Sequence, residues 1–379
     1  MKKLLVASTA LVAFAAVNSA QAADPIKISI GGYLNEFVSY TDQDDDGGQN
    51  FAEVNINSES ELYFRGSTTL DNGLTVSVNI DRYADRDEGS GDDVFLQVAS
   101  DSMGKLRIGS TKGAAYALSH QATDVAVTNN DGGVGSGIHK FFNRPGNVYS
   151  DQTQTASEAN DGIKIVYWTP SFAGFTAGVS YGVNQNGIGL HSVIDLESND
   201  LNGATPGTPT GDRAADAGIA YNGDFNGVSV GADFTYQRDF LGGLTGTANE
   251  DRKAWRAGLS VGVAGFTVAG SYRDTSNERN LKDVDSKGWE AGVSYATGPY
   301  EVSLTYTNFK EDTAANSGLE HENKQWALGG SYDMGAGVKL VGAIIGAEYD
   351  DGTTAGAAET NSTTDNEGFG VVTGLKVSF

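Results

Sequence analysis

The feature that most constrains the fold of this chain is an alternation of apolar with polar or small residues, repeated with a period of two along most of its length. A period of two places successive side chains on opposite faces of a β-strand. The pattern runs through residues 74–80, 175–181, 228–236, 266–273 and 371–379. No segment follows the period of about 3.6 residues that marks an amphipathic helix. The chain is therefore predicted to be all-β.

The connections between these segments fall into two classes that alternate strictly along the chain. Seven are tight turns with Gly where a positive φ is needed, and eight are longer and polar. The turns lie near residues 71–73, 101–104, 172–174, 222–227, 264–265, 298–299 and 334–337, and the long connections near 41–51, 86–92, 112–160, 184–213, 240–251, 274–285, 310–321 and 350–365. Fifteen connections join sixteen strands, and strand edges cannot stay unpaired in lipid. The expected fold is a transmembrane 16-stranded antiparallel up-and-down β-barrel with short periplasmic turns and long extracellular loops, closed by pairing the strand from Ile26 with the strand that ends at Phe379.

The two faces of the predicted strands differ in a way that a soluble core does not explain. One face carries Val, Leu, Ile and Ala in mid-strand and aromatic rings near the strand ends, as at Tyr272, Trp289, Tyr300 and Trp326, which is typical of the girdles of membrane barrels. The other face is rich in polar residues that would be costly to bury without water. A closed sheet with such an interior is a water-filled channel. The alternative is a large soluble β-sandwich or β-solenoid, which the two loop classes and the lack of a fixed repeat disfavour.

Composition and the first residues bear on partners and compartment. The 379 residues carry 49 acidic and 25 basic side chains, a net charge of −24, which argues against nucleic acid as a partner. Mean hydropathy is −0.31, and after the first two dozen residues no apolar run reaches the ~18 residues of a membrane helix. Two early lysines, the apolar residues 4–17 and the small-residue pattern at 20–22 are typical of a signal peptide. Residues 1–22 are expected to be cleaved, which leaves residues 23–379 as a single barrel domain.

Four stretches of the chain resemble Gram-negative general porins. They are residues 162–175 (GIKIVYWTPSFAGF), residues 61–66 (ELYFRG) followed by Leu74 and Val76, residues 104–109 (GKLRIG), and the terminal Phe379. The first is similar to the strand, turn and strand that follow the third loop of that family. The resemblance implies a non-specific porin in the outer membrane of a Gram-negative bacterium, usually a homotrimer, in contact with lipid and lipopolysaccharide. It also implies that the third loop is folded into the pore.

Residues 112–160 form the longest connection and match this third loop. A loop of such length in a compact domain is usually functional, although an ordinary outer loop is the alternative. Basic side chains that alternation turns inward would face acidic side chains on the loop, and the resulting transverse field would orient dipolar solutes. The resemblance adds a basic residue from the segment FFNRPG. The expected constriction residues are Arg65, Lys105, Arg107, Asp124, Asp131, Arg144 and Lys164.

The first long connection contains a possible cation-binding motif. Asp42, Asp44 and Asp46, followed by Gly47 and by Glu53 at position 12, satisfy the spacing of a calcium loop. The flanking segments are predicted strands rather than the helices of an EF-hand, so a solvated acidic hairpin tip is the alternative. We expect that no cofactor is required and that calcium could bind on the outer loops.

The sequence favours a channel over an enzyme. The four histidines lie in or beside predicted loops, with no GxSxG or HExxH motif and no cysteine. A barrel hydrolase using a serine with His120 or His139 is the enzyme alternative, and a solute-specific or adhesive barrel would need lumen aromatics, for which Tyr63 and Trp168 are candidates. The predicted function is passive diffusion of small hydrophilic solutes and ions. A weak preference for cations is expected, because the loops are acidic and Glu61 stands where some porins have arginine.

Overall fold

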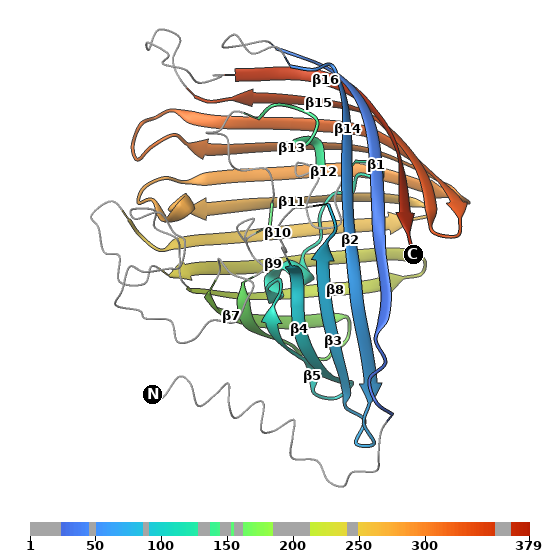
Figure 1. Ribbon diagram of the computed structural model, residues 1–379. Coiled ribbons are helices and arrows are strands. Elements are labelled where there is room, and N and C mark those ends of the chain that lie inside the picture. Colours follow the sequence, from blue (N-terminus) through green and yellow to red (C-terminus); the bar gives the residue numbers. More distant parts are fainter. Residues whose placement is uncertain are drawn as a thin grey trace.

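Sixteen antiparallel strands form one closed barrel, in which every strand pairs with its neighbours in the sequence (Figure 1). The computed structural model describes residues 24–44, 51–85, 91–127, 137–144, 153–154, 162–184, 213–240, 249–352 and 365–379. The strands are β1 (Ser29–Gln43), β2 (Val54–Thr69), β3 (Thr75–Tyr83), β4 (Gly91–Ser100), β5 (Gly104–Ser110), β6 (Ile163–Trp168), β7 (Phe175–Asn184), β8 (Arg213–Phe225), β9 (Val228–Phe240), β10 (Arg252–Val263), β11 (Phe266–Ser276), β12 (Ser286–Thr297), β13 (Tyr300–Asp312), β14 (Glu320–Gly335), β15 (Val338–Asp350) and β16 (Asp365–Ser378). The predicted fold class is confirmed.

The barrel closes by pairing β1 with β16. Tyr33 lies opposite Ser378, and the ladder continues to the other end of both strands. Beyond it, Gly32 and Phe379 exchange two backbone hydrogen bonds of 2.9 and 3.0 Å. The closure is as expected, but β1 begins at Ser29 rather than at Ile26, because the ladder with β2 starts at Ser29.

Tight turns join the strands at the end of the barrel where β1 begins. In four of them both central residues have positive φ, and two examples are 50° and 86° at Ala264 and Gly265, and 51° and 79° at Ala336 and Gly337. This backbone defines a type I′ turn, whose twist matches that of antiparallel strands. The two alanines are strained at positive φ, so the ladders on either side hold them there.

The outward wall is apolar in its middle and aromatic towards both rims. Val179, Leu259 and Leu328 in mid-strand are about half exposed. Neighbouring rings pair near the turns and again near the loops: Phe266 with Tyr295, Tyr300 with Tyr332, Trp255 with Tyr272, and Trp289 with Tyr306. These two rows have the arrangement of lipid-interface girdles. In the part of the chain that the structure describes, no helix is long and apolar enough to cross a membrane.

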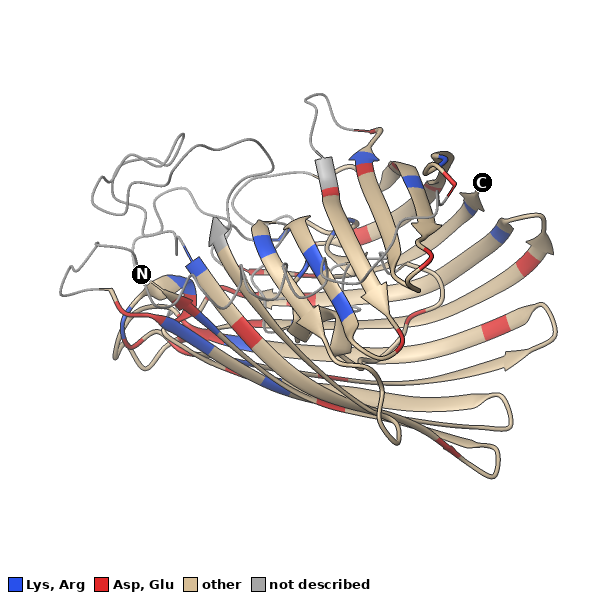
Figure 2. Cartoon of the chain, turned by 90° about the horizontal axis from the view of Figure 1, so that it is seen from below, with Lys and Arg blue, Asp and Glu red and all other residues tan. Residues whose placement is uncertain are grey.

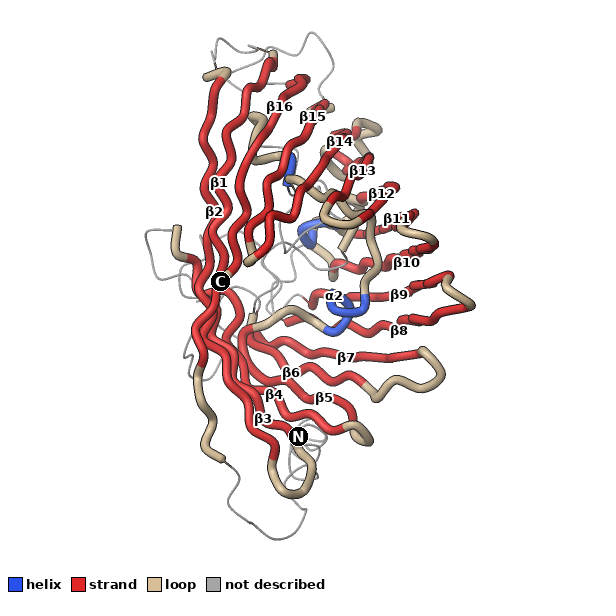
Figure 3. The backbone as a smooth tube through the Cα atoms, turned by 90° about the vertical axis from the view of Figure 1, so that its right-hand side faces the viewer, coloured by secondary structure: helices blue, strands red, loops and turns tan. Residues whose placement is uncertain are grey.

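The best-packed apolar groups lie inside the barrel, between its wall and the third long loop. The short helix α2 (Ala114–Leu118) belongs to this loop and contacts β7 and β8 from within (Figure 3). One apolar cluster contains Leu118 and Trp168, and a second contains Phe37 and Phe141. Basic and acidic residues are interleaved on the strands (Figure 2). The interior is therefore filled on one side by the loop.

Candidate pore and its constriction

The third loop enters the barrel directly after β5 and is fastened at its first turn. Lys164 on β6 donates from Nζ to the carbonyl of Thr111, where the loop begins. The backbone N–H of Ala115, in α2, donates to the carboxylate of Asp216 on β8 at 2.7 Å. A carboxylate that accepts from backbone amides near the start of a short helix stabilises that helix. The loop is thus held against the inner wall from its start.

A second anchor lies two residues after α2, at His120. Its backbone N–H donates to Oδ2 of Asp233 on β9 at 2.6 Å, and its Nε2 lies 2.8 Å from the Asn222 amide oxygen. Asp233 also pairs with Arg256 at 2.6 Å, and both of these side chains are fully buried. The hydrogen bond with Asp233 raises the pKa of His120 above its ordinary value. His120 therefore anchors the third loop to the inner wall through Asp233 and Asn222.

A third anchor surrounds Asp124. Its Oδ1 accepts from the backbone N–H groups of Ala126 and Val127 at 2.8 and 2.6 Å. The N–H of Val125 donates to the Ser303 hydroxyl on β13 at 3.1 Å. Asp124 is 3% exposed, so its carboxylate fixes the loop backbone and does not present an open charge to the lumen.

Residues 137–144 cross to the seam of the barrel, which is where β1 pairs with β16. The ring of Phe141 packs edge-on against Phe37 of β1, with ring centroids 5.9 Å apart. Lys140 reaches Glu59 on β2 at 3.0 Å, and the N–H of Asn143 donates to the Gln43 amide oxygen at 2.9 Å. All described pieces of residues 112–160 therefore touch inward side chains. The inward fold of the loop is confirmed, and the alternative of an ordinary outer loop does not apply to these pieces.

Strands β2 and β5 carry Arg65, Lys105 and Arg107, the basic side chains that alternation turned inward and that stay at least partly exposed. Arg65 is half exposed, pairs with Asp81 at 2.5 Å and lies over the ring of Tyr63. Arg107 stacks on Phe95 with its guanidinium carbon 3.9 Å from the ring centroid. It also donates to Gln97 on β4 and to Thr111. On this wall, the positively charged guanidinium groups of Arg65 and Arg107 are therefore positioned by stacking on aromatic rings.

The other expected constriction residues differ in their access to the lumen. Lys105 is exposed and lies over Trp168, whereas Lys164 is 3% exposed beneath the loop. Arg144 is partly exposed at the end of the described segment. Asp131 lies outside the described residues. The structure therefore brings Arg65, Lys105, Arg107 and Lys164 onto one wall and places Asp124 against another.

The aromatic candidates for a sugar-binding track face inward but are not both available. Trp168 is 4% exposed under α2, and Tyr63 is covered in part by Arg65. Stacking of a carbohydrate needs open ring faces. These two residues do not form a continuous track.

Sequence analysis missed a buried ionic network on the inner faces of β9 to β12. Arg252 pairs with Asp239 at 3.2 Å and with Glu278 at 2.7 Å. Arg273 lies 3.6 Å from Glu278, which belongs to the 3-10 turn η2 (Glu278–Asn280) in the next loop. Burial alone would raise the pKa of the Glu278 carboxyl, but the two arginines lower it to about 2. The inward orientation of Arg252 and Arg273 could have been predicted from the sequence, because they alternate with the outward Trp255 and Tyr272.

The calcium motif is only partly described. Asp42 and Asp44 lie at the loop end of β1 on its outward face, and the carbonyl of Glu53 accepts from the N–H of Thr41 at 2.8 Å. Asp46 lies outside the described residues. Among the described residues, the one group of three or more acidic side chains that brings one oxygen from each within 4.8 Å of the others is a different one, formed by Asp350, Asp351 and Asp365.

A closed barrel with an apolar outer band, two aromatic rows and a loop folded inside defines a membrane channel. A model of the Gram-negative porin family matches residues 7–353, and the chain belongs to this family. It is therefore a channel protein of the bacterial outer membrane. Among solved structures, the chain is similar to an anion-selective porin from Comamonas acidovorans, with 18% identity over 94% of this chain and 100% of that one and a TM-score of 0.60. It is also similar to the trimer form of OmpT from Vibrio cholerae, with 13% identity over 94% and 100% and a TM-score of 0.59. No curated protein sequence matches significantly.

Proposed function

We propose that the protein is a non-specific diffusion channel for small hydrophilic solutes and ions. The observation that carries this proposal is the one-sided position of the third loop, which is anchored to β8, β9 and β13 and reaches the seam. The basic side chains of Arg65 and Lys105 remain accessible on the opposite wall. An ordinary porin function needs a hydrated gap of this kind and no dedicated ligand groups.

A weak preference for cations is the second part of the proposal. The net charge is −24, or −26 without the two lysines of residues 1–22, and acidic loops concentrate cations near the entrance over about 10 Å at 0.1 M salt. Arg65, one of the inward bases, is already paired with Asp81. The solved Comamonas porin is described as anion-selective, so selectivity varies among barrels of this shape.

The decisive experiment is single-channel recording in planar bilayers with a KCl gradient. The zero-current potential should report a cation preference at 0.1 M salt that fades as salt rises, because screening weakens the loop field. Chloride preference at 0.1 M would show that the inward basic residues dominate. Saturating block by an oligosaccharide would instead favour a solute-specific channel.

Three further properties are part of the proposal. Residues 1–22 act as a signal peptide, and the mature chain forms a homotrimer, supported by the trimer form of the Vibrio barrel. The outer surface contacts lipid and lipopolysaccharide.

Calcium at Asp42, Asp44, Asp46 and Glu53 stays a prediction, which isothermal titration of the purified protein with CaCl2 tests.

A further inference from the structure

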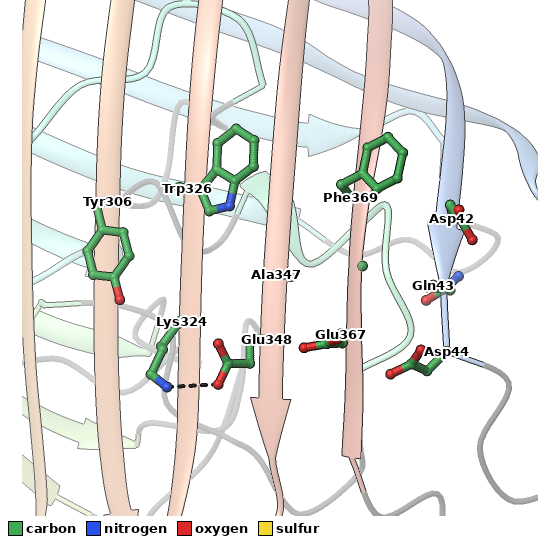
Figure 4. Close-up of a pocket in the computed structure, with 11 residues that line it drawn as sticks. Asp42, Gln43, Asp44, Tyr306, Lys324, Trp326, Ala347, Glu348, Glu367 and Phe369 are labelled. Carbon is green, nitrogen blue, oxygen red and sulfur yellow. Dashed lines mark hydrogen bonds and ion pairs between the residues drawn. The ribbon is translucent and has the colours of Figure 1, made fainter.

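A second site lies on the outward surface, at the end of the barrel from which the long loops leave. It is a cavity of about 430 Å³ lined by residues of β13 to β16 and of the end of β1 (Figure 4). Its aromatic and charged side chains share the strand face of the exposed apolar residues. Trp326 lies on the same face of β14 as the outward Leu328, and Phe369 on the same face of β16 as the outward Val371. The cavity therefore faces the surroundings of the barrel, away from the path of permeating solutes.

Strand register forms one side of the cavity as a row of rings. Tyr306 lies opposite Trp326, Trp326 opposite Gly346, and Gly346 opposite Phe369. The indole of Trp326 lies across Gly346, where an added Cβ would collide with it. The missing side chain at Gly346 is what lets the indole lie flat across β15, so that Trp326 and Phe369 both line the cavity.

A row of charges lies two residues nearer the loops. Lys324 is opposite Glu348, and Glu348 is opposite Glu367. The backbone N–H of Asp44 donates to the carbonyl of Glu367 at 3.0 Å, which brings Asp44 next in the row. Like charges directly opposite on neighbouring strands are destabilising. The row therefore contains repulsion that a bound cation would relieve.

The protein's own bases compensate this charge only in part. Nζ of Lys324 lies 2.8 Å from Glu348 and 3.3 Å from Glu322, so this cation is shared between two carboxylates. Within the described residues, no Lys or Arg forms an ion pair with Asp42, Asp44 or Glu367. The adjoining segments 45–50 and 353–364 contain no Lys or Arg in their sequence.

We propose that this pocket binds the ammonium headgroup of an amphiphile in the surrounding membrane. The ammonium would donate to the carboxylates of Asp44 and Glu367, and the adjoining apolar part would lie against the rings of Trp326 and Phe369. The pocket lies at the boundary between the apolar band and the loops, where such a headgroup sits. Nothing in this proposal depends on the selectivity of the pore.

Asp42 and Asp44 are shared with the predicted calcium motif, so the two hypotheses compete, and a bare divalent cation matches the pocket less well than an ammonium group. Calcium needs six to eight oxygens that converge on one point. Among the described residues, the one group of three or more acidic side chains that brings one oxygen from each within 4.8 Å of the others lies outside the pocket, at Asp350, Asp351 and Asp365. Carboxylates spread around a cavity with aromatic walls suit a larger organic cation.

The test is native mass spectrometry of the full barrel, released from a neutral detergent with added lipid. The probes are phosphatidylethanolamine, which carries a primary ammonium, and phosphatidylglycerol with the same acyl chains, which does not. We expect the wild-type barrel to retain phosphatidylethanolamine at a concentration about tenfold lower than phosphatidylglycerol. The double variant Asp44→Asn with Glu367→Gln should lose this difference. Asp274→Asn removes an outward carboxylate of β11 outside the pocket and should keep it.

Three outcomes would overturn the proposal. One is equal retention of the two lipids by the wild-type barrel, a measurement that needs no variant. Another is an unchanged preference in the double variant when its barrel is folded. The third is retention that requires added calcium and disappears with a chelator, which would make a metal ion the ligand.

Discussion

Three arginines of the inner wall, Arg252, Arg256 and Arg273, are at most 4% exposed although they line a barrel that carries water. Each is matched by carboxylates, as in the Arg256–Asp233 pair. Removing one partner of a buried pair is destabilising by ~3–5 kcal/mol, because the other charge stays buried. At the scale of the residue, these charges therefore hold loops against the inner wall, and we expect the wall with Arg65 and Lys105 to set the electric field in the pore.

Replacing Arg107 with Glu should strengthen the preference for cations. A unit charge about 4 Å from an ion contributes ~1 kcal/mol even in water, so reversing it should change the permeability ratio severalfold. The measurement is the zero-current potential in a KCl gradient. The control is Lys253→Glu, which makes the same charge change next to Glu250 near the loop end of β10. An equal shift in both variants would mean that total charge, and not the inward wall, determines selectivity.

The anchor at His120 should be stronger at acidic pH. The hydrogen bond with Asp233 raises the pKa of His120 in the folded protein. The contribution of this contact is therefore full below the ordinary pKa and is lost as pH rises through the raised value. Since the chain has no cysteine, a spin label at Thr123→Cys reports the loop alone. Its mobility should rise between pH 5.5 and 8.5, and His120→Gln should remove the change.

At the scale of elements, the third loop is fixed to the inner wall both at its start and at the seam, where β1 pairs with β16. Ile138 is fully buried with Phe37 and Phe141 at the seam, while Asp216 and Asp233 hold the start. Phe141→Ala should free the seam end, since truncating a buried Phe costs ~3–5 kcal/mol. We expect noisier single-channel currents with an intact barrel. Phe172→Ala, at an 82% exposed turn position, is the matched control and should leave the noise unchanged.

Shortening the loop should widen the pore. A deletion of residues 129–136 is preferable to one that reaches Ile138, because Ile138 is part of the seam cluster. Single-channel conductance should rise, since chain that occupies the lumen restricts its area. A folded deletion variant with unchanged conductance would place these residues outside the conducting path.

Alternation and turn chemistry were sufficient to predict the strands, because both act through neighbouring residues. The same reasoning turned Arg65, Lys105 and Arg107 inward, which the structure shows. It could not place Asp124, whose partner Ser303 is 179 positions away. Contacts between a loop and a wall join residues so distant in the sequence that no local pattern carries them. The cavity lined by Trp326 and Phe369 is a cross-strand feature and was missed for the same reason.

At the scale of the whole molecule, the ladder between β1 and β16 is what makes the sheet a barrel. Removing residues 365–379 would leave β1 and β15 with open edges, and unpaired backbone groups are costly in lipid. The truncated chain should fail to form the compact, heat-modifiable band that folded barrels show in detergent electrophoresis. Glu367→Gln, which leaves the ladder intact, is the control and should give the folded band.

The seam also bears on synthesis. Tyr33 of β1 and Ser378 of β16 are paired although 345 positions separate them, so their contact cannot form before β16 has been translated. A sheet that forms before β16 is available has two unpaired edge strands, β1 and β15, which can associate with other chains. The arrival of β16 is the event that removes both at once. A chain that contains β16 can close its barrel, whereas a fragment that lacks this strand keeps both edges open.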